Sequence, residues 1–198
     1  MVQALRSCKL FRTYDFFGPL NNRTKSTKRF AQNRTFRATH CANHKTIKII
    51  KKMKNKIFKT NNDWTGVITR LTMGLILFPH GAQKMLGMFG GYGFTGTMGF
   101  FTDTMNLPSI IGFLVIIIEF IGALSLIAGF ASRIWSALTI ILFLGIIFTS
   151  HLHNGFFMNW FGNQKGEGYE YHLLIVGLAI ATLINGSGKY SVDERLVK

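Results

Sequence analysis

The sequence predicts an all-α fold, an integral membrane four-helix bundle with both the N- and the C-terminus in the cytoplasm. Two observations predict it. The chain of 198 residues is 48% hydrophobic and also carries a net charge of +15. That charge is confined to residues 1–60, which hold 16 Lys and Arg and one acid, whereas residues 61–198 hold 7 of each sign. The neutral part contains four apolar runs, and about 20 apolar residues cross a bilayer core of ~30 Å.

Residues 1–60 are predicted to form a basic, disordered leader, because they are rich in Lys, Arg, Asn and Thr and lack a sustained apolar period. Three interpretations stay open: a transit-like presequence, a tail for nucleic acid or anionic lipid, and an artefact of the chosen start site. Met53 opens a short basic segment directly before the first apolar run, so the true start is placed near Met53 in the third interpretation. Specific nucleic-acid binding is not expected.

Charge and cysteine placement exclude several classes of protein. Because residues 61–198 carry no net charge, the chain is not a uniformly basic nucleic-acid-binding domain. The apolar runs in the same residues are long enough to span a membrane, which excludes a soluble globular enzyme. Both cysteines, Cys8 and Cys41, lie in the leader. Residues 61–198 therefore contain no dithiol relay and no Cys-ligated metal or haem attachment, and any redox chemistry there uses His, Glu or a bound organic molecule.

The four predicted spans cover residues 64–86, 109–130, 134–152 and 171–184. The second and third are each about 20 residues long, which is enough to cross the bilayer core. The first and fourth carry polar residues, which buried helices of a bundle tolerate; the alternative for these two is an interfacial or re-entrant helix. A short turn at 129–133 makes the second and third spans an antiparallel pair.

The connections at 81–108 and 153–169 are rich in glycine. Residues 91–96 read GYGFTG, a literal G-x-G-x-x-G, but they follow a membrane helix and not a strand, so dinucleotide binding is rejected. We expect these glycines to let a compact loop fold over the outer mouth of the bundle.

Positive charges set the predicted orientation. The outer loops hold only Lys84 and Lys165. The segments assigned to the inner side hold Lys51, Lys52, Lys54, Lys56, Lys59, Arg133, Lys189, Arg195 and Lys198. An even number of spans then places both termini in the cytoplasm.

Two ionisable residues lie at depth. Arg70 is six residues into the first span, ~9 Å above the inner boundary, and Glu119 is about ten residues into the second, ~15 Å below the outer boundary. In a slab of ~30 Å the two depths differ by ~6 Å. An unpaired charge there costs roughly 2.5–3.5 kcal/mol. We therefore predict a structural ion pair between Arg70 and Glu119, or a protonated and hydrogen-bonded Glu119.

Histidines form a second group at the outer boundary. They are His80 at the end of the first span, His151 and His153 at the end of the third, and His172 at the start of the fourth beside Glu170. Such convergence is compatible with metal or haem ligation or with proton transfer to a quinone. The alternative is that these histidines are partly hydrated at the membrane boundary and have no functional role. No metal ligand set is assigned.

The residues then resemble a known family. The run PHGAQKMLG at 79–87, Glu119, Arg133, the GYE entry at 168–170 and the GSG…SVD ending at 186–193 are similar to the DoxX family of small four-helix membrane proteins. The resemblance covers about residues 62–194. It implies a bacterial cytoplasmic-membrane protein, with some members linked to quinone-related redox or oxidative-stress systems. Positions that match the family's polar pattern are Arg70, His80, Lys84, Glu119, Arg133 and Glu170.

Two function hypotheses follow. The first is a subunit or accessory of a quinone-linked oxidoreductase or redox-stress system, with His80, Lys84, Glu119 and Glu170 as candidate proton donors and Arg133, His151 and His172 as further polar candidates. No electron carrier is visible in the sequence, so either redox partner subunits or a bound cofactor would supply electrons to the quinone. The second is a non-enzymatic membrane scaffold or small-solute carrier. Besides the lipid bilayer, a homo-oligomeric partner is also compatible with the sequence.

Overall fold

The computed structural model describes residues 47–49, 53 and 57–197, and every regular element among them is helical. The chain divides into two units, Met1–Met53 and Lys54–Lys198, and all elements considered below belong to the second. The leader predicted for residues 1–60 therefore lies mostly outside the described residues. Its last residues contact the helices, since the Lys59 carbonyl accepts a hydrogen bond from Arg133 and the Thr60 hydroxyl accepts one from the Gly188 N–H.

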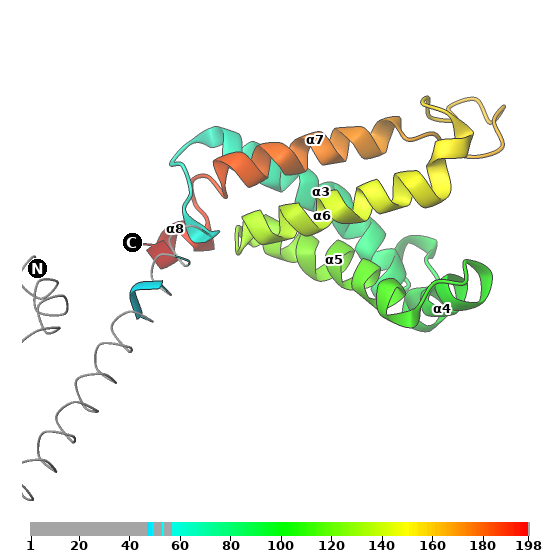
Figure 1. The fold of residues 1–198 in the computed structure, drawn as a ribbon, viewed down its shortest axis with the longest axis horizontal. Coiled ribbons are helices and arrows are strands. Elements are labelled where there is room, and N and C mark those ends of the chain that lie inside the picture. The colour runs from blue at the N-terminus through cyan, green and yellow to red at the C-terminus, as the bar shows by residue number, and fades with distance from the viewer. Residues whose placement is uncertain (1–46, 50–52, 54–56, 198) are drawn as a thin grey trace, which may run out of the picture. The chain divides into compact units, whose positions relative to one another are not determined.

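The helical unit is built from four long helices that lie lengthwise beside one another (Figure 1). These are α3 (Trp64–Leu86), α5 (Ser109–Ala128), α6 (Ser132–Ile146) and α7 (Glu170–Asn185), at the positions that the sequence predicts. The short helix α4 (Gly93–Gly99) and the loop of residues 155–169 lie at one end, and α8 (Val192–Val197) lies at the other. We call these the loop end and the α8 end.

Short helical turns complete the chain. They are 3-10 turns at Met88–Gly90 and Leu152–Asn154 and π turns at Phe100–Thr104 and Ile147–His151. The two turns after α6 continue its helical path to Asn154.

Two helices of the described residues are long and apolar enough to cross a membrane, Ser109–Ala128 and Ser132–Asn154. The helix α7 is apolar but shorter, with 16 residues. Large apolar side chains on these helices face outward, among them Leu114, Ile141, Phe148 and Leu174. Water-facing helices carry polar side chains on their outer face, so this pattern indicates apolar surroundings.

Two glycines set the register between α3 and α5. A Cβ atom on Gly81 would lie 2.5 Å from the backbone of Glu119, and one on Gly74 would lie 3.1 Å from the Ala123 carbonyl oxygen. The two glycines are seven residues apart and therefore share one helix face. Small residues allow helix backbones to approach this closely in membrane proteins, so Gly81 lies level with Glu119.

Apolar side chains of α3, α5, α6 and α7 fill the space between the helices. The buried cluster consists of Met73, Leu77, Ala123, Leu126, Phe143, Ile175, Val176 and Ala179. It lies between the polar groups of the loop end and those of the α8 end.

The glycine-rich connection at 81–108 differs from the predicted loop, since it contains α4 and a π turn. Packing explains the helix. The ring of Phe94 meets Phe113 edge-on at 6.4 Å between centroids, and a Cβ atom on Gly112 would lie 3.1 Å from Phe101. Tertiary contacts with α5 therefore stabilise helical backbone that glycine disfavours by about 1 kcal/mol per residue.

Candidate functional site

Arg70 binds backbone carbonyl groups at the α8 end. Its side chain is 3% exposed and donates hydrogen bonds to five carbonyl oxygens, those of Leu126, Ile127, Ser187, Lys189 and Tyr190. The first two belong to the last turn of α5, whose carbonyls lack partners within the helix. A guanidinium has five donors in a planar fork, which suits such a set of acceptors.

The predicted ion pair between Arg70 and Glu119 is therefore wrong. Glu119 lies seven residues before Leu126, which is ~10 Å along α5. The two side chains do not meet because α3 and α5 pack in a register that places Arg70 beside the last turn of α5 and not beside Glu119. A Cβ atom on Gly66 would lie 2.6 Å from the Gly188 nitrogen, so α3 starts level with the segment that follows α7.

Asp193 completes the polar cluster of the α8 end. Its carboxylate accepts hydrogen bonds from the N–H groups of Ala131 at 2.7 Å and Ser132 at 3.1 Å, which begin α6. The Ser187 hydroxyl also bonds to this carboxylate. A cation at the end of α5 and an anion at the start of α6 both match the helix dipoles. This cluster joins the helix ends, because its side chains bond to the backbone of these ends and to one another.

The second polar group lies at the loop end. Lys84 Nζ and Glu119 Oε2 are 2.5 Å apart and form an ion pair, with 26% of the Lys84 side chain and 6% of the Glu119 side chain exposed. Gly81 positions this ion pair. The close approach of α3 to α5 at Gly81 brings the next turn of α3, which carries Lys84, beside Glu119. Glu119 faces the interior, as predicted, but with Lys84 as its partner.

Residues at the start of α7 extend this site. The hydroxyl of Tyr171 and Nδ1 of His172 are buried and have no hydrogen-bond partner. The hydroxyl of Tyr171 lies within electrostatic range of Glu119, and the ring of His172 lies within electrostatic range of His80 and His151. Buried polar atoms are normally paired, so the two atoms without partners are available to a ligand or to water.

The rings of His151 and His172 lie 4.2 Å apart between centroids. His151 Nδ1 lies 2.7 Å from the Glu167 carbonyl oxygen, which can only accept, so Nδ1 carries the proton. The Nε2 atom of neutral His151 is then an acceptor. The described residues contain no group of three or more His, Cys, Asp or Glu that could hold a metal ion.

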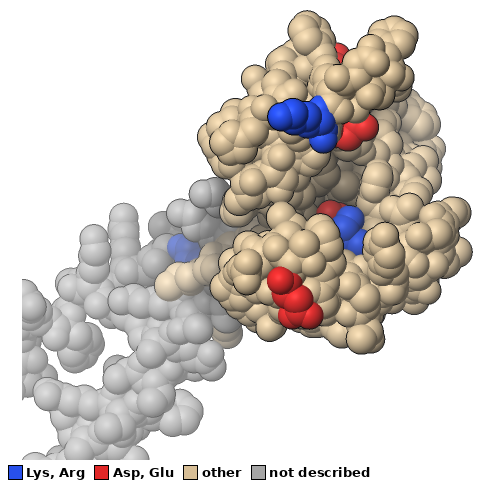
Figure 2. Space-filling view, turned by 90° about the vertical axis from the view of Figure 1, so that its right-hand side faces the viewer, with Lys and Arg blue, Asp and Glu red and all other residues tan. Residues whose placement is uncertain are grey.

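Figure 2 shows the loop end from outside. The surface is hollowed between the lobe of α4 and the lobe of residues 155–169, and one basic and one acidic side chain adjoin inside the hollow. The ion pair of the described residues is Lys84 with Glu119. We call the site formed by Lys84, Glu119, Tyr171, His172 and His151 the loop-end site.

Comparisons with known proteins agree with the sequence pattern. The DoxX family model matches residues 66–152. A protein of Bacillus subtilis (strain 168) named "Putative oxidoreductase CatD" is 30% identical over 132 residues, which are 67% of this chain and 87% of that protein. The chain belongs to the DoxX family. No solved structure matches it.

DoxX proteins are membrane proteins, and this one has two helices suited to crossing a membrane. The DoxX match includes Lys84, Glu119 and His151 of the loop-end site but ends before Tyr171 and His172. The helix α7 therefore adds Tyr171 and His172 to the site, to which α3 contributes Lys84 and α5 contributes Glu119.

The structure separates the predicted site residues of this DoxX protein into two groups. At the loop end Lys84 pairs with Glu119, the ring of His151 lies beside that of His172, and His80 is exposed nearby. Glu170 also lies there, but its carboxylate accepts the Met158 N–H at 3.4 Å and so holds the loop.

Arg70 and Arg133 lie at the α8 end. Arg133 donates to the carbonyls of Lys59 and Ile184, which again is a structural role. Sequence reasoning missed Tyr171, and its position between Glu170 and His172 at a helix start was the available signal.

Proposed function

We propose that this DoxX protein binds a quinone at the loop-end site and acts as a subunit or accessory of a quinone-linked oxidoreductase in the bacterial cytoplasmic membrane. One observation carries the proposal: the partly buried Lys84–Glu119 pair lies within electrostatic range of Tyr171, and the buried polar atoms of Tyr171 and of the next residue, His172, have no partner. A few polar side chains held inside an otherwise apolar interior are typical of ligand sites in membrane proteins.

The chemistry of these groups suits a quinone. The two carbonyl oxygens of a quinone accept hydrogen bonds, and the Tyr171 hydroxyl and the Lys84 ammonium are donors. The ammonium has three donors, of which Glu119 takes one. When a quinone is reduced it takes up protons, and Lys84 with Glu119 can hold and pass them. Electrons would come from a reduced partner protein, and the relative's name as an oxidoreductase supports this direction.

In this proposal α3, α5, α6 and α7 all cross the bilayer as a four-helix bundle. The apolar outer faces of α5, α6 and α7 support it. The basic residues of the α8 end, among them Lys59, Arg133 and Arg195, support a cytoplasmic position for that end.

Binding of a quinone analogue to the purified protein tests the proposal. We expect the wild-type protein to bind a short-chain menaquinone or ubiquinone analogue and Tyr171→Phe to bind it about tenfold more weakly, because one hydrogen bond worth roughly 1.4 kcal/mol is lost. Tyr92→Phe is the matched control, since Tyr92 is 84% exposed and lies in the connection before α4. Titration followed by isothermal calorimetry measures both.

Two results would contradict the proposal. One is that the wild-type protein fails to bind any quinone analogue at saturating concentration. The other is that Tyr171→Phe and Tyr92→Phe bind as tightly as the wild type, which would place the ligand elsewhere.

A small-solute carrier is the alternative function. A carrier needs a path from one side of the bundle to the other, and the cluster around Met73, Leu77 and Phe143 fills the space between the two polar ends. This packing favours a site that opens at one end only. A scaffold role would agree with an absence of quinone binding in the titration above.

A further inference from the structure

The loop of residues 155–169, which we call the aromatic loop, carries large rings on its outside. Trp160 and Phe161 are 80% and 88% exposed, and Phe157 is 67% exposed. Phe156 is also exposed. Removing such a ring from water is favourable, so leaving several of them in water is costly.

The polar atoms of the same loop are used within it. The Asn159 side chain bonds to both the N–H and the carbonyl of Gln164, and the Asn159 N–H donates to the Glu167 carboxylate at 2.9 Å. His151 and Asn154 both donate to the Glu167 carbonyl. The polar groups of the loop are therefore bonded to one another, while the rings of Trp160 and Phe161 stay exposed.

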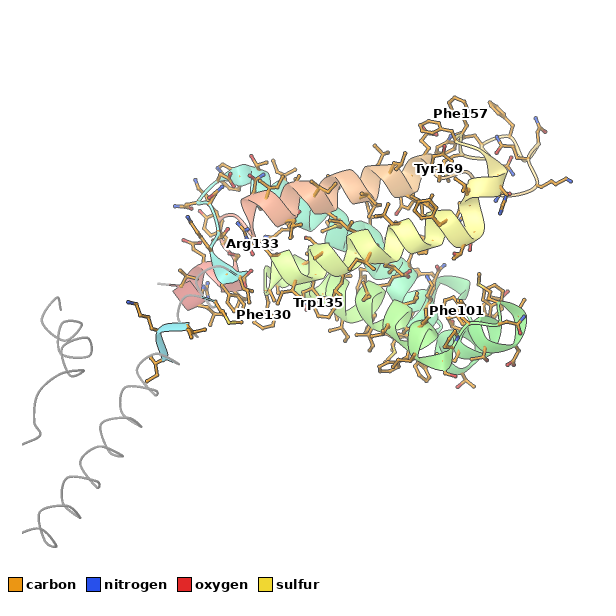
Figure 3. The ribbon with its side chains drawn as sticks, viewed as in Figure 1. Phe101, Phe130, Arg133, Trp135, Phe157 and Tyr169 are labelled. Carbon is orange, nitrogen blue, oxygen red and sulfur yellow. The ribbon has the colours of Figure 1, made fainter. Side chains whose placement is uncertain are left out.

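The rings also continue the apolar face of α6. Along the helical path from Ser132 to Asn154, exposed apolar side chains recur at intervals of three and four residues, at Ile141, Leu144, Phe148 and Leu152. This path is one of the two suited to crossing a membrane. Phe156 and Phe157 follow directly after it, and Figure 3 shows Phe157 at the outer edge of the loop.

We propose that the aromatic loop lies in the interface of the lipid bilayer, with its rings among the headgroups and upper acyl chains. Tryptophan combines a large apolar ring with an N–H donor and is enriched at this depth. Lys165, exposed in the same loop, reaches the aqueous side. The occupant of this surface is lipid, because the rings extend a helix face that already meets acyl chains. This inference is independent of the proposed quinone site.

Depth-dependent fluorescence quenching tests it in the full-length protein. The chain has three tryptophans, so Trp64→Phe with Trp135→Phe leaves Trp160 alone. The protein is reconstituted into phosphatidylcholine vesicles that carry a nitroxide either near the headgroup or deep in the acyl chain, and iodide is the quencher in water. We expect blue-shifted emission, the largest loss of emission with the shallow nitroxide, and little loss with iodide.

The matched control moves the fluorophore within the same loop. Adding Trp160→Phe and Lys165→Trp to the same background places the only tryptophan at the predicted aqueous position. We expect iodide to quench this variant strongly and the shallow nitroxide to quench it less than it quenches Trp160.

The other outcomes overturn the inference. Iodide quenching of Trp160 equal to that of the Lys165→Trp variant would place the rings in water. Protection of Trp160 from both nitroxides and iodide would mean that protein covers it, in a second copy or a partner. If the multiple variants fail to fold, the wild type and the single variant Trp160→Phe are compared instead. The difference between their emission spectra is the emission of Trp160. The inference requires that this emission is quenched by the nitroxide lipids and resists iodide.

Discussion

The buried charges of α3 and α5 are neutralised in two different ways. Glu119 has a charged partner, Lys84, while Arg70 binds carbonyl oxygens at the end of α5 and in the segment before α8. A charge at membrane depth costs roughly 2.5–3.5 kcal/mol unless it finds such partners. The fork of a guanidinium suits several carbonyls at once, and the flexible stem of a lysine suits a single carboxylate.

A double-mutant cycle on Lys84 and Glu119 checks this pairing. We expect Lys84→Met and Glu119→Gln each to destabilise the protein, because each leaves a partly buried group unpaired. The double variant should lose less than the sum of the single variants, with a coupling energy of roughly 0.5–3 kcal/mol. Thermal unfolding in mild detergent, followed by circular dichroism, gives the changes in stability.

The matched control is the cycle on Arg70 and Glu119, the pair that the sequence alone predicts. Arg70→Lys combined with Glu119→Gln should be additive within about 0.5 kcal/mol, because the two side chains share no partner and are widely separated. Coupling in the Arg70 cycle together with additivity in the Lys84 cycle would show that Glu119 pairs with Arg70 and not with Lys84.

At the next scale, glycines decide how the helices approach. Gly74 and Gly81 let α3 and α5 come so close that any side chain at either position would meet backbone or a neighbouring residue. The turn between α5 and α6 depends on charge instead, since Arg70 binds the last carbonyls of α5 and Asp193 binds the first N–H groups of α6. Both devices fix register, one by steric contact and one by hydrogen bonds.

Gly81→Ala tests the steric device. The added Cβ atom would lie 2.5 Å from the Glu119 carbonyl, and backbone must shift to admit it. Overpacking of this kind costs typically about 1–3 kcal/mol, and we expect the thermal midpoint to fall accordingly. The shift should also weaken the Lys84–Glu119 pair.

Gly177→Ala on α7 is the control for this prediction, because a Cβ atom there would meet nothing within 4 Å. Alanine favours helix over glycine by about 1 kcal/mol, so this variant should be as stable as the wild type or more stable. Equal destabilisation by the two substitutions would show that close approach at Gly81 is not needed.

For the molecule as a whole, the two ends differ in chemistry. The α8 end gathers Arg133, Lys189 and Arg195 with a fully hydrogen-bonded polar cluster, while the loop end holds the loop-end site and the exposed rings. If α7 crosses the bilayer as proposed, residues 165 and 195 lie on opposite sides, and the basic residues of the α8 end predict that residue 195 is the cytoplasmic one.

Cysteine labelling tests this topology. In a background with Cys8→Ser and Cys41→Ser, Lys165→Cys should react with a membrane-impermeant maleimide in intact cells, because the proposed orientation places residue 165 outside. Arg195→Cys should react only after the cells are permeabilised. Labelling of both positions in intact cells would show that α7 does not cross, and the reverse pattern would show that the orientation is inverted.

The sequence by itself determined the helical class, the positions of the four long helices and the apolar character of their outer faces. Hydropathy and helix-forming patterns depend on neighbouring residues in the sequence, so they can be read without knowing which helices pack together. The helix α3 spans Trp64–Leu86, as its apolar run predicts. Only the tertiary structure decided that Glu119 pairs with Lys84, that Arg70 binds carbonyls, that Tyr171 joins the site and that α4 is helical. These features depend on the register between helices, which close contacts at Gly66, Gly74 and Gly81 set, and a shift of two turns moves a side chain by ~10 Å.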